Sequence, residues 1–575
     1  MDLDELRAAG ALELLDVEMA RALARAAGAS DADIELAIAL TSRSVRRGHT
    51  CFPLETSAAG LSPQQAVPAP LLPDVSRWAA RLRKSPLTNR GPLVLDERNR
   101  LYLRRYWQLE RDVADALAKR SALASAELPD ASWVEKTLRR LFQGTPESAQ
   151  AAAAKNAIAN RVSLLCGGPG TGKTSAVAVI VALLTERALR DTQAPPKVLL
   201  LAPTGKSAAR LGESVSRAKA RIAASDQVLD AIPEEAMTIH RALGMQPTGF
   251  RFRRSADHPL EADIIVVDEA SMIDLALMRQ LLDATPMGST LLIVGDPDQL
   301  TSVEAGSVLQ DLVTANTQTW WRGRCTHLTK TFRYAAEQPL GQLVAAIRAG
   351  DPVEVQRIME LQEAPDVTWL PFGKLNAELD RAAALWSETL READPEEHFA
   401  RRTRFAILTP YRVGPTGTQR LGAAIAARLS SSPTPSANVI PIIIEQNSQE
   451  LRVFNGDFAM LVGPDRRRAF IQRASEGPYE VAEARLPHYS DAFALSVHKA
   501  QGSEFDEVLI VLPEEDGPLL SRELLYTAVS RARKRVRLVG APEVIAAAVG
   551  RQAQRYSGLV DAIAATSRAP GQVSV

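Results

Sequence analysis

The chain contains 575 residues, which is too many for a single hydrophobic core, so two to four domains are expected. Hydrophobic residues account for 46% and charged residues for 24%, as is ordinary for a soluble globular protein. Lysine plus arginine and aspartate plus glutamate both total 68. This balance disfavours a protein that coats DNA through a wholly basic surface, although it leaves room for a motor with a local channel.

The cysteines and the first residues indicate the cellular compartment. Cys51, Cys166 and Cys325 are widely separated and include no CxxC pair, so their spacing predicts neither a zinc site, an iron–sulfur cluster nor a disulfide framework. The chain begins with acidic residues, without the apolar core of a signal peptide, and no apolar run is long enough to span a membrane. We therefore expect a soluble protein of a reducing cytoplasm.

Residues 1–140 are expected to form a mainly helical domain. Apolar residues recur at helical spacing up to about residue 56, and helical patterns return at 75–82 and 102–119. A stretch rich in Ser, Pro and Gln at 57–74 indicates a loop or linker, and 92–95 indicates an extended segment. The apolar positions that carry the first helical spacing are Leu12, Leu15, Met19, Leu23, Ile34 and Ile38.

Residues 167–174 match the phosphate-loop pattern G-x-x-x-x-G-K-[ST] without interruption. An apolar run at 161–166 predicts a buried strand before the loop, and an Ala-, Val- and Leu-rich run predicts a helix after it. At such a turn, backbone N–H groups and the helix N-terminus cradle a triphosphate. Lys173 is expected to reach the β- and γ-phosphates and Thr174 to ligate Mg²⁺, while a purely structural glycine turn is the alternative. The loop comprises Gly167, Gly168, Pro169, Gly170, Thr171, Gly172, Lys173 and Thr174.

Polar side chains follow two further predicted strands. The apolar strand at 263–267 ends in Asp268 and Glu269, at the edge of an α/β sheet where ligands bind. Asp268 is expected to hold Mg²⁺ through water, and Glu269 to act as the general base toward the attacking water. An ordinary solvated acidic pair is the alternative. The apolar run at 290–294 leads to Gln299, an uncharged side chain able to sense a γ-phosphate. Together these features predict a P-loop NTPase core.

The alternation of apolar runs and helical patterns predicts an α/β fold with two doubly wound parallel sheets. The first core is expected at 141–340, with strands that start near residues 161, 197, 263 and 290 and with a hairpin insertion at 244–260. The second core is expected at 341–436 and 490–575, with strands at 404–408, 507–512 and 535–539. A small all-β insertion is expected at 437–489, with strands at 440–444, 451–454, 458–462 and 469–472.

Several motifs outside the phosphate site carry Lys, Arg, His and hydroxyl groups. The run APTGKSAAR at 202–210 opens a predicted helix and is suited to grip a backbone phosphate. Taken singly, Lys206 is expected to be solvated, His498 to be a structural histidine and Arg531 to lie on the surface. The order in which the motifs of these three residues occur along the chain, together with the two phosphate-site motifs, favours functional roles instead.

In chain order, the segments GGPGTGKT, APTGKSAARL, VVDEAS, GDPDQL, TKTFRY, SVHKAQGSEF and LYTAVSRARKRV resemble the superfamily 1 helicase motifs over about residues 146–540. The N-terminal segments LDVEMA, SRSVRRGHTCFPL and LYLRRYW resemble the alpha subunits of exodeoxyribonuclease V, the D chains of RecBCD complexes. This resemblance implies two RecA-like domains, an SH3-like insertion and a helicase that uses ATP and Mg²⁺ to travel 5′→3′ along DNA.

The same resemblance implies roles for single residues. Gln150 resembles a glutamine that reads adenine, with an ordinary polar helix residue as the alternative, and Glu504 is implied to contact the ribose. Arg333 and Arg531 resemble arginines that reach the γ-phosphate from opposite sides, so hydrolysis would require the two cores to close. The implied DNA-side residues are Thr204, Lys206, His240 and His498.

The resemblance also implies partners. These are single-stranded DNA or a duplex end, and the beta and gamma subunits of a heterotrimer that repairs double-strand breaks by homologous recombination in the bacterial cytoplasm, at the nucleoid. Residues 1–140 are implied to bind the partner subunits, and the nuclease activity is expected in the beta subunit. The alternatives are a stand-alone superfamily 1B helicase, a non-translocating P-loop switch, and a structural subunit with an idle motor.

Overall fold

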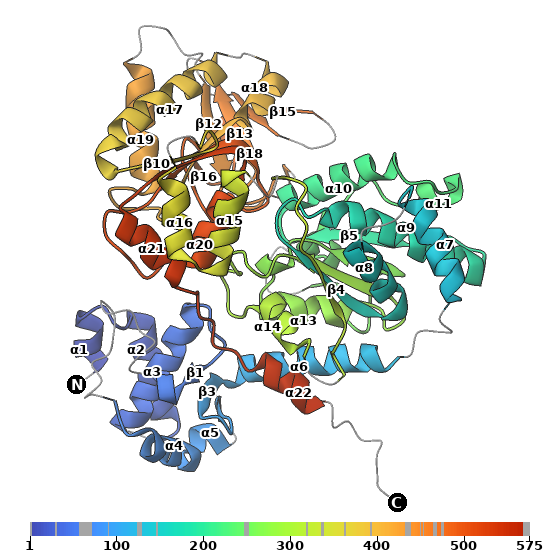
Figure 1. The fold of residues 1–575 in the computed structure, drawn as a ribbon. Coiled ribbons are helices and arrows are strands. Elements are labelled where there is room, and N and C mark those ends of the chain that lie inside the picture. The colour runs from blue at the N-terminus through green and yellow to red at the C-terminus, as the bar shows by residue number, and fades with distance from the viewer. Residues whose placement is uncertain are drawn as a thin grey trace, which may run out of the picture.

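The computed structural model describes residues 3–28, 31–56, 72–89, 91–123, 129–144, 148–245, 252–317, 320–334, 338–361, 364–391, 394–431, 439–448, 450–451, 453–463, 468–472 and 477–566. These residues form a helical N-terminal region, two α/β cores and an antiparallel sheet (Figure 1). Most of the linker predicted at 57–74 lies outside the described residues. No helix within the described ranges is long and apolar enough to cross a membrane.

The N-terminal region contains a three-stranded sheet in addition to the expected helices. β3 lies in the middle and pairs antiparallel with β1 and β2, whereas the sequence predicted only one extended segment here. The elements are α1 (Leu3–Ala8), α2 (Leu14–Ala26), α3 (Ala32–Arg46), β1 (Phe52–Pro53), α4 (Val75–Lys84), α5 (Pro86–Asn89), β2 (Leu93–Leu95) and β3 (Arg100–Leu103).

The α2 helix buries a different face from the one that its larger apolar residues suggest. Leu15 is 63% exposed, while Val17 and Ala20 are fully buried. The reason is Asp16, whose buried carboxylate accepts hydrogen bonds from Ser42 Oγ and Arg46 Nη2, both at 2.8 Å. A buried carboxylate needs such partners, and they lie on α3, so this side of α2 faces inward. The predicted helix is confirmed, although Leu15, one of the positions that carry its apolar spacing, lies on its exposed side.

The first core is a six-stranded parallel sheet with the order β6-β5-β7-β8-β4-β9. The four predicted strands are confirmed, and the sequence missed the short β6 and the edge strand β9. The strands are β4 (Val162–Gly167), β5 (Val198–Ala202), β6 (Met237–Thr238), β7 (Ile264–Val267), β8 (Thr290–Gly295) and β9 (Cys325–Leu328). All residues of β4, β7 and β8 are buried, as expected for a sheet covered by helices on both faces.

Helices cover both faces of this sheet. Apolar residues of α6 and α7, which precede the predicted start of the core, are buried in the two hydrophobic clusters that flank the sheet. The predicted hairpin at 244–260 lies partly outside the described residues, and Met245 and Phe252 form an antiparallel bridge at its base. The helices are α6 (Arg104–Ala122), α7 (Ala131–Leu141), α8 (Ser148–Ala159), α9 (Lys173–Thr192), α10 (Gly205–Lys219), α11 (Asp226–Ala231), α12 (Ile239–Leu243), α13 (Leu275–Ala284) and α14 (Val308–Ala315).

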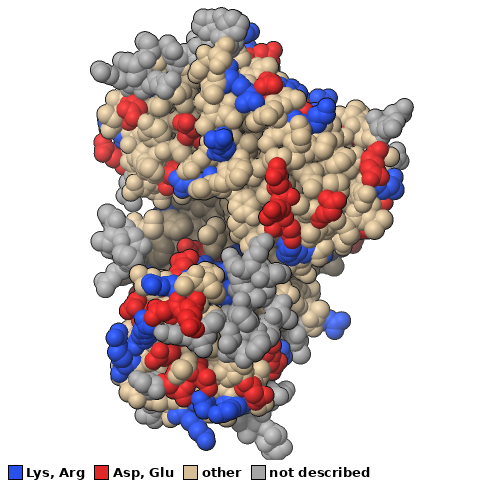
Figure 2. All heavy atoms as spheres, turned by 90° about the vertical axis from the view of Figure 1, so that its left-hand side faces the viewer, with Lys and Arg blue, Asp and Glu red and all other residues tan. Residues whose placement is uncertain are grey.

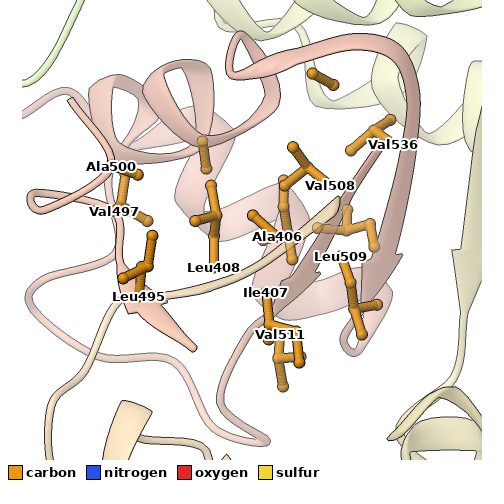
Figure 3. Packing of buried hydrophobic residues seen from close by; sticks show 14 of the residues in the cluster. Ala406, Ile407, Leu408, Leu495, Val497, Ala500, Val508, Leu509, Val511 and Val536 are labelled. Atoms are coloured by element: carbon orange, nitrogen blue, oxygen red, sulfur yellow. The ribbon is translucent and has the colours of Figure 1, made fainter. Parts of the chain in front are cut away.

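The second core is a five-stranded parallel sheet with the order β10-β19-β18-β11-β17. Figure 3 shows Ala406, Leu408 and Val508 on one face of its central strands and Ile407, Leu509 and Val511 on the other. The strands are β10 (Val367–Leu370), β11 (Phe405–Thr409), β17 (Leu495–Ser496), β18 (Phe505–Val511) and β19 (Ala532–Val539). The helices are α15 (Pro339–Ala349), α16 (Pro352–Met359), α17 (Leu375–Leu390), α18 (Pro395–Arg402), α19 (Thr418–Ser430), α20 (Arg522–Val529) and α21 (Pro542–Gly550).

The predicted all-β insertion forms a separate antiparallel sheet with the order β15-β14-β13-β12-β16. Phe458 and Met460 of β13 belong to the core of the second domain, whereas Ala459 and Leu461 belong to the insertion's own core. The strand predicted at 451–454 is wrong, since Val453 forms only an isolated bridge with Ser448. The strands are β12 (Val439–Ile444), β13 (Phe458–Val462), β14 (Arg468–Ile471), β15 (Tyr479–Ala482) and β16 (Tyr489–Asp491).

The C-terminal segment connects the three parts of the molecule. After α21, residues 551–558 run without regular structure to α22 (Leu559–Thr566), which packs on α6 and α14 (Figure 1). Tyr556 O accepts a hydrogen bond from Thr50 N at 2.9 Å, and Arg555 donates to Arg47 O and Ser302 O. The segment therefore leaves the second core after α21 and bonds to both the N-terminal region and the first core.

Acidic and basic side chains are interspersed on the face drawn in Figure 2, over both the N-terminal region and the second core. Charges of both signs lie beside one another there, in agreement with the balanced composition. This face therefore presents no broad field of a single sign.

We expect Glu110→Ala to lower the free energy of unfolding by about 1–3 kcal/mol, because the buried Glu110 carboxylate accepts three hydrogen bonds that alanine cannot replace. Its donors are Thr50 Oγ1 at 2.5 Å, Gly558 N at 2.9 Å and Ser557 Oγ at 3.1 Å. Chemical denaturation measures the loss. Exposed Glu97→Ala is the matched control, and equal stability of the two variants would contradict the structural role of Glu110.

Candidate functional site

The phosphate loop joins β4 to α9, as the sequence predicted. Gly170 and Gly172 have φ angles of +73° and +81°, which residues with a Cβ rarely adopt. A Cβ on Gly170 would also collide with the Cβ of Arg333, because residues 331–333 lie along the loop and Phe332 N donates to Gly170 O at 2.7 Å. Both glycines are therefore required by backbone conformation, and the first also by the close approach of the Arg333 segment.

Lys173 occupies the mouth of the loop. Its ammonium donates to the carbonyl oxygens of Gly167 at 2.6 Å and Gly168 at 3.0 Å. Thr174 is half-buried in the first turn of α9, and a Cβ on Gly172 would lie 3.0 Å from Nε2 of Gln150 on α8. The structure thus brings Gln150, Lys173 and Thr174 together around the loop, where backbone N–H groups at a helix N-terminus suit a polyphosphate.

The acidic pair follows β7 directly. Asp268 Oδ1 accepts a hydrogen bond from Glu269 N at 2.8 Å, and Glu269 has a φ angle of +51°, a left-handed conformation that is uncommon outside glycine. Burial, followed by the neighbouring Glu269 carboxylate, raises the pKa of Asp268 to about 6, while Lys173 acts in the opposite direction. The strained turn places both carboxylates beside the phosphate loop.

Gln299 belongs to a hydrogen-bonded group that spans both cores. Its Nε2 donates to Asp296 Oδ2 at 2.9 Å, and the same oxygen accepts from Tyr526 OH of the second core at 3.1 Å. Leu300 N donates to Thr527 Oγ1 at 2.9 Å. Asp296 thus connects Gln299 to Tyr526 of α20, and the neighbouring Leu300 bonds to α20 itself.

Glu504 gathers arginines from both cores. Its carboxylate pairs with Arg210 of α10 and with Arg333 of the first core, and it accepts from Arg533 Nε of the second core at 3.1 Å. Burial alone would raise the pKa of Glu504, but the attraction of Arg210 and then Arg333 outweighs it and holds the pKa well below its usual range. In this conformation Glu504 is an arginine partner, and its expected contact with a ribose stays a prediction.

Arg531 is buried inside the second core. Its guanidinium donates to Thr527 O at 3.0 Å and to Ser503 O at 3.3 Å. Burial lowers its pKa, while the nearby Glu269 carboxylate raises it, so the side chain lies within electrostatic range of the acidic pair. Arg333 reaches the same place from the first core, where Nη1 donates to Ser530 O at 3.2 Å. The two arginines thus approach the phosphate site from different cores.

Two of the expected DNA-side residues, Thr204 and Lys206, lie in the first turn of α10. Thr204 Oγ1 caps the helix by accepting from Ser207 N at 3.2 Å. Lys206 Nζ lies 3.9 Å from the ring centre of Phe458 in the insertion, and burial, followed by repulsion from Arg402, lowers its pKa. In this conformation Lys206 is enclosed against the insertion, and its contact with a DNA phosphate stays a prediction.

The other two expected DNA-side residues are His240 and His498, and the strand that leads into His240 pairs with the strand before Thr204. The His240 ring lies 6.1 Å from that of Phe252, and burial lowers the pKa of both histidines. Within the described ranges no hydrogen bond or ring contact joins either histidine to Thr204 or Lys206. Their DNA contacts stay predictions.

Sequence reasoning missed Asp296, Tyr526 and Arg210 as members of the site. Asp296 and Tyr526 stand inside the motifs GDPDQL and LYTAVSRAR, so their positions were visible, but their pairing depends on how the cores meet. Arg210 closes the APTGKSAAR motif, and its partner Glu504 lies 294 residues away. No sequence spacing signals a contact of this kind.

Three family models match the chain. They are described as AAA domain over residues 150–305, UvrD-like helicase C-terminal domain over residues 491–539, and RecBCD enzyme subunit RecD, N-terminal domain, over residues 8–102. The first and second cover parts of the two cores, and the third covers the helical region that precedes them.

The RecBCD enzyme subunit RecD of Mycobacterium tuberculosis is 39% identical over 576 residues, which cover 96% of this chain and 95% of the relative. The subunit of the same name from Mycolicibacterium smegmatis is 38% identical over 566 residues, which cover 95% and 97%. The ATP-dependent RecD2 DNA helicase of Deinococcus radiodurans is 30% identical over 478 residues, which cover 81% of this chain but 59% of the relative. The similarity to the two RecD subunits thus extends over nearly the whole of both chains.

We expect magnesium-dependent nucleotide binding to weaken as the pH falls through about 6, the pKa of Asp268, because the protonated side chain cannot ligate a cation. The apparent dissociation constant should rise about tenfold per pH unit below 6 and level off above 7. Titration of a fluorescent ATP analogue with Mg²⁺, and with a chelator as the metal-free control, measures it. Asp268→Asn should bind weakly at every pH, and a flat wild-type profile down to pH 5 would contradict the assignment.

We expect Glu504→Gln to tighten ATP binding about 3–10-fold, because Arg210 and Arg333 lose the carboxylate that competes with a triphosphate. Equilibrium titration of ATP and of inorganic triphosphate measures the change. Glu507→Gln, three residues further along the chain on β18, is the matched control, since Glu507 pairs with Arg381 and Arg535, not with the arginines that face the loop. Weaker binding of ATP with unchanged binding of inorganic triphosphate would favour the ribose contact instead.

Proposed function

This chain belongs to the family of RecBCD enzyme subunits RecD, and we propose that it is the ATP-dependent 5′→3′ DNA helicase subunit of a helicase–nuclease complex for double-strand break repair by homologous recombination. One observation carries the proposal. Residues from two RecA-like cores meet around one phosphate loop, so ATP bound there would contact both cores.

The hydrolytic roles are proposed from the placement of the side chains. Lys173 and the loop N–H groups bind the β- and γ-phosphates, and Gln150 binds the adenine. Thr174 and Asp268 hold Mg²⁺, which neutralises charge on the phosphate oxygens. Glu269 accepts a proton from the attacking water, and Arg333 and Arg531 stabilise the charge that develops on the transferred group.

Closure of the cores is proposed to couple hydrolysis to movement. Gln299 shares Asp296 with Tyr526, so loss of the γ-phosphate near Gln299 changes a contact with the second core. Arg333 is exchanged between Glu504 and the γ-phosphate, which links nucleotide binding to the ion pairs that join the cores. If each core holds single-stranded DNA, alternating closure and opening moves the chain along the strand.

DNA is proposed to pass along the side where α10 meets the insertion. Thr204 and Lys206 supply a helix N-terminus and a cation there, and Phe454 and Phe458 of the insertion lie against the same turn. His240 and His498 are proposed as further contacts. Residues 244–260 are proposed to separate the strands of a duplex at the point of entry to this path.

The beta and gamma subunits are proposed as partners, with residues 1–140 as the docking region and the nuclease activity in the beta subunit. The share of each relative that the chain covers favours this assignment over a stand-alone helicase. The chain spans 95% of the Mycobacterium tuberculosis RecD subunit but 59% of the Deinococcus radiodurans RecD2 helicase.

The motor assignment predicts that Lys173→Gln lowers DNA-stimulated ATP hydrolysis at least about 100-fold, because the loop loses its phosphate-binding cation. ATPase rates with and without single-stranded DNA, and unwinding of a duplex with a 5′ overhang, measure the effect for the chain alone and with its two partner subunits. Lys197→Gln, whose side chain is 69% exposed, is the control and should match the wild type.

Two outcomes would contradict this assignment. Hydrolysis that ignores DNA, with no unwinding even beside the partner subunits, would favour a non-translocating ATPase switch. Unwinding that requires a 3′ overhang would overturn the proposed direction of travel.

A further inference from the structure

A cluster of two cysteines and one histidine lies at the edge of the first core. β9 is the edge strand of the sheet, and it pairs in parallel with β4 so that Cys166 stands opposite His327 and Leu164 opposite Cys325. Side chains two residues apart on a strand point to the same face, so Cys325 and His327 share one face of β9. Cys166, in register with His327 on the neighbouring strand, completes the group.

The donor atoms of these three residues are close enough to share one ion. The two sulfur atoms lie 3.5 Å apart, and Cys325 Sγ lies 3.2 Å from His327 Nε2. All three donor atoms lie within 4.8 Å of one another. Ligands at about 2.0–2.3 Å from a tetrahedral zinc ion have separations of this order. Cys166 is buried, Cys325 is partly exposed and His327 is exposed, so the cluster combines a rigid base with access from solvent.

We propose that Cys166, Cys325 and His327 bind one soft divalent metal ion of the zinc class, with a water molecule in the fourth position. Thiolate and imidazole ligands select zinc over magnesium, which prefers oxygen, so this site is chemically distinct from the magnesium site expected at Thr174 and Asp268. Because the two cysteines are far apart in the sequence, their spacing did not predict the site. The parallel pairing of β4 with β9 brings them together. The site does not depend on the helicase assignment.

Metal titration of the full-length chain tests the proposal. Untagged protein, reduced and freed of metal with a chelator, is titrated with Zn²⁺ against a chromophoric zinc indicator in the presence of excess Mg²⁺. We expect one equivalent per chain, and Co²⁺ in place of Zn²⁺ should give a thiolate-to-cobalt charge-transfer band. His327→Ala and Cys325→Ser should each weaken zinc binding by more than about 100-fold, since loss of outer-sphere partners alone costs about 10–100-fold.

Cys51→Ser is the matched control, because it removes a buried thiol outside the cluster, and it should keep the full equivalent. Thermal unfolding of the metal-free variants checks their folding, and exposed His327 offers a substitution that leaves the buried core intact. Binding below one equivalent, or equal binding by wild type and His327→Ala, would overturn the proposal. Formation of a Cys166–Cys325 disulfide by peroxide in a chain that binds no Zn²⁺ would identify a redox pair instead.

Discussion

The parallel pairing of β4 with β8 on one side and β9 on the other is the constraint on which the site depends. Because the buried β4 lies between β8 and the edge strand β9, its carboxyl end holds the phosphate loop between the Gln299 segment after β8 and the Arg333 segment after β9. The buried hydrophobic residues of these three strands therefore position the phosphate loop, the Gln299 segment and the Arg333 segment next to one another. The same register brings Cys166 to Cys325 and His327, so one ladder builds both the phosphate site and the proposed metal site.

Ion pairs and hydrogen bonds join the two cores, beside the packing of Leu300 and Tyr334 of the first core into the hydrophobic cluster of the second. Buried Glu504 collects guanidinium groups from both cores, and such a contact is favourable only while its partners stay paired. A triphosphate carries the same sign of charge as this carboxylate and would compete for Arg333. The hydrogen bonds from Tyr526 OH to Asp296 and from Leu300 N to Thr527 Oγ1 do not involve these arginines, so such an exchange leaves them in place. The junction is thus suited to rearrangement, because its contacts are polar and exchangeable.

The C-terminal segment couples the N-terminal region to the motor. Residues 551–558 leave the second core, bond to Thr50 and Arg47, and lead into α22 on the first core. Glu110 on α6 binds this segment and Thr50 together, so a force on the N-terminal region reaches both cores through buried hydrogen bonds. These contacts connect the N-terminal region with α6 and α22 of the first core.

The sequence by itself determined the elements that local pattern controls. Continuous apolar runs become strands buried on both faces, and the glycines of residues 167–174 encode a turn that only they can adopt, so the loop, Asp268, Glu269 and Gln299 were all found. Only the tertiary structure decided the contacts between distant residues. Leu15 belongs to the apolar spacing of α2, yet it is exposed while Asp16 is buried and bonded to α3, and Glu504 meets Arg210 across 294 residues. Such pairings depend on how separate elements pack in space, and local sequence patterns carry no information about that packing.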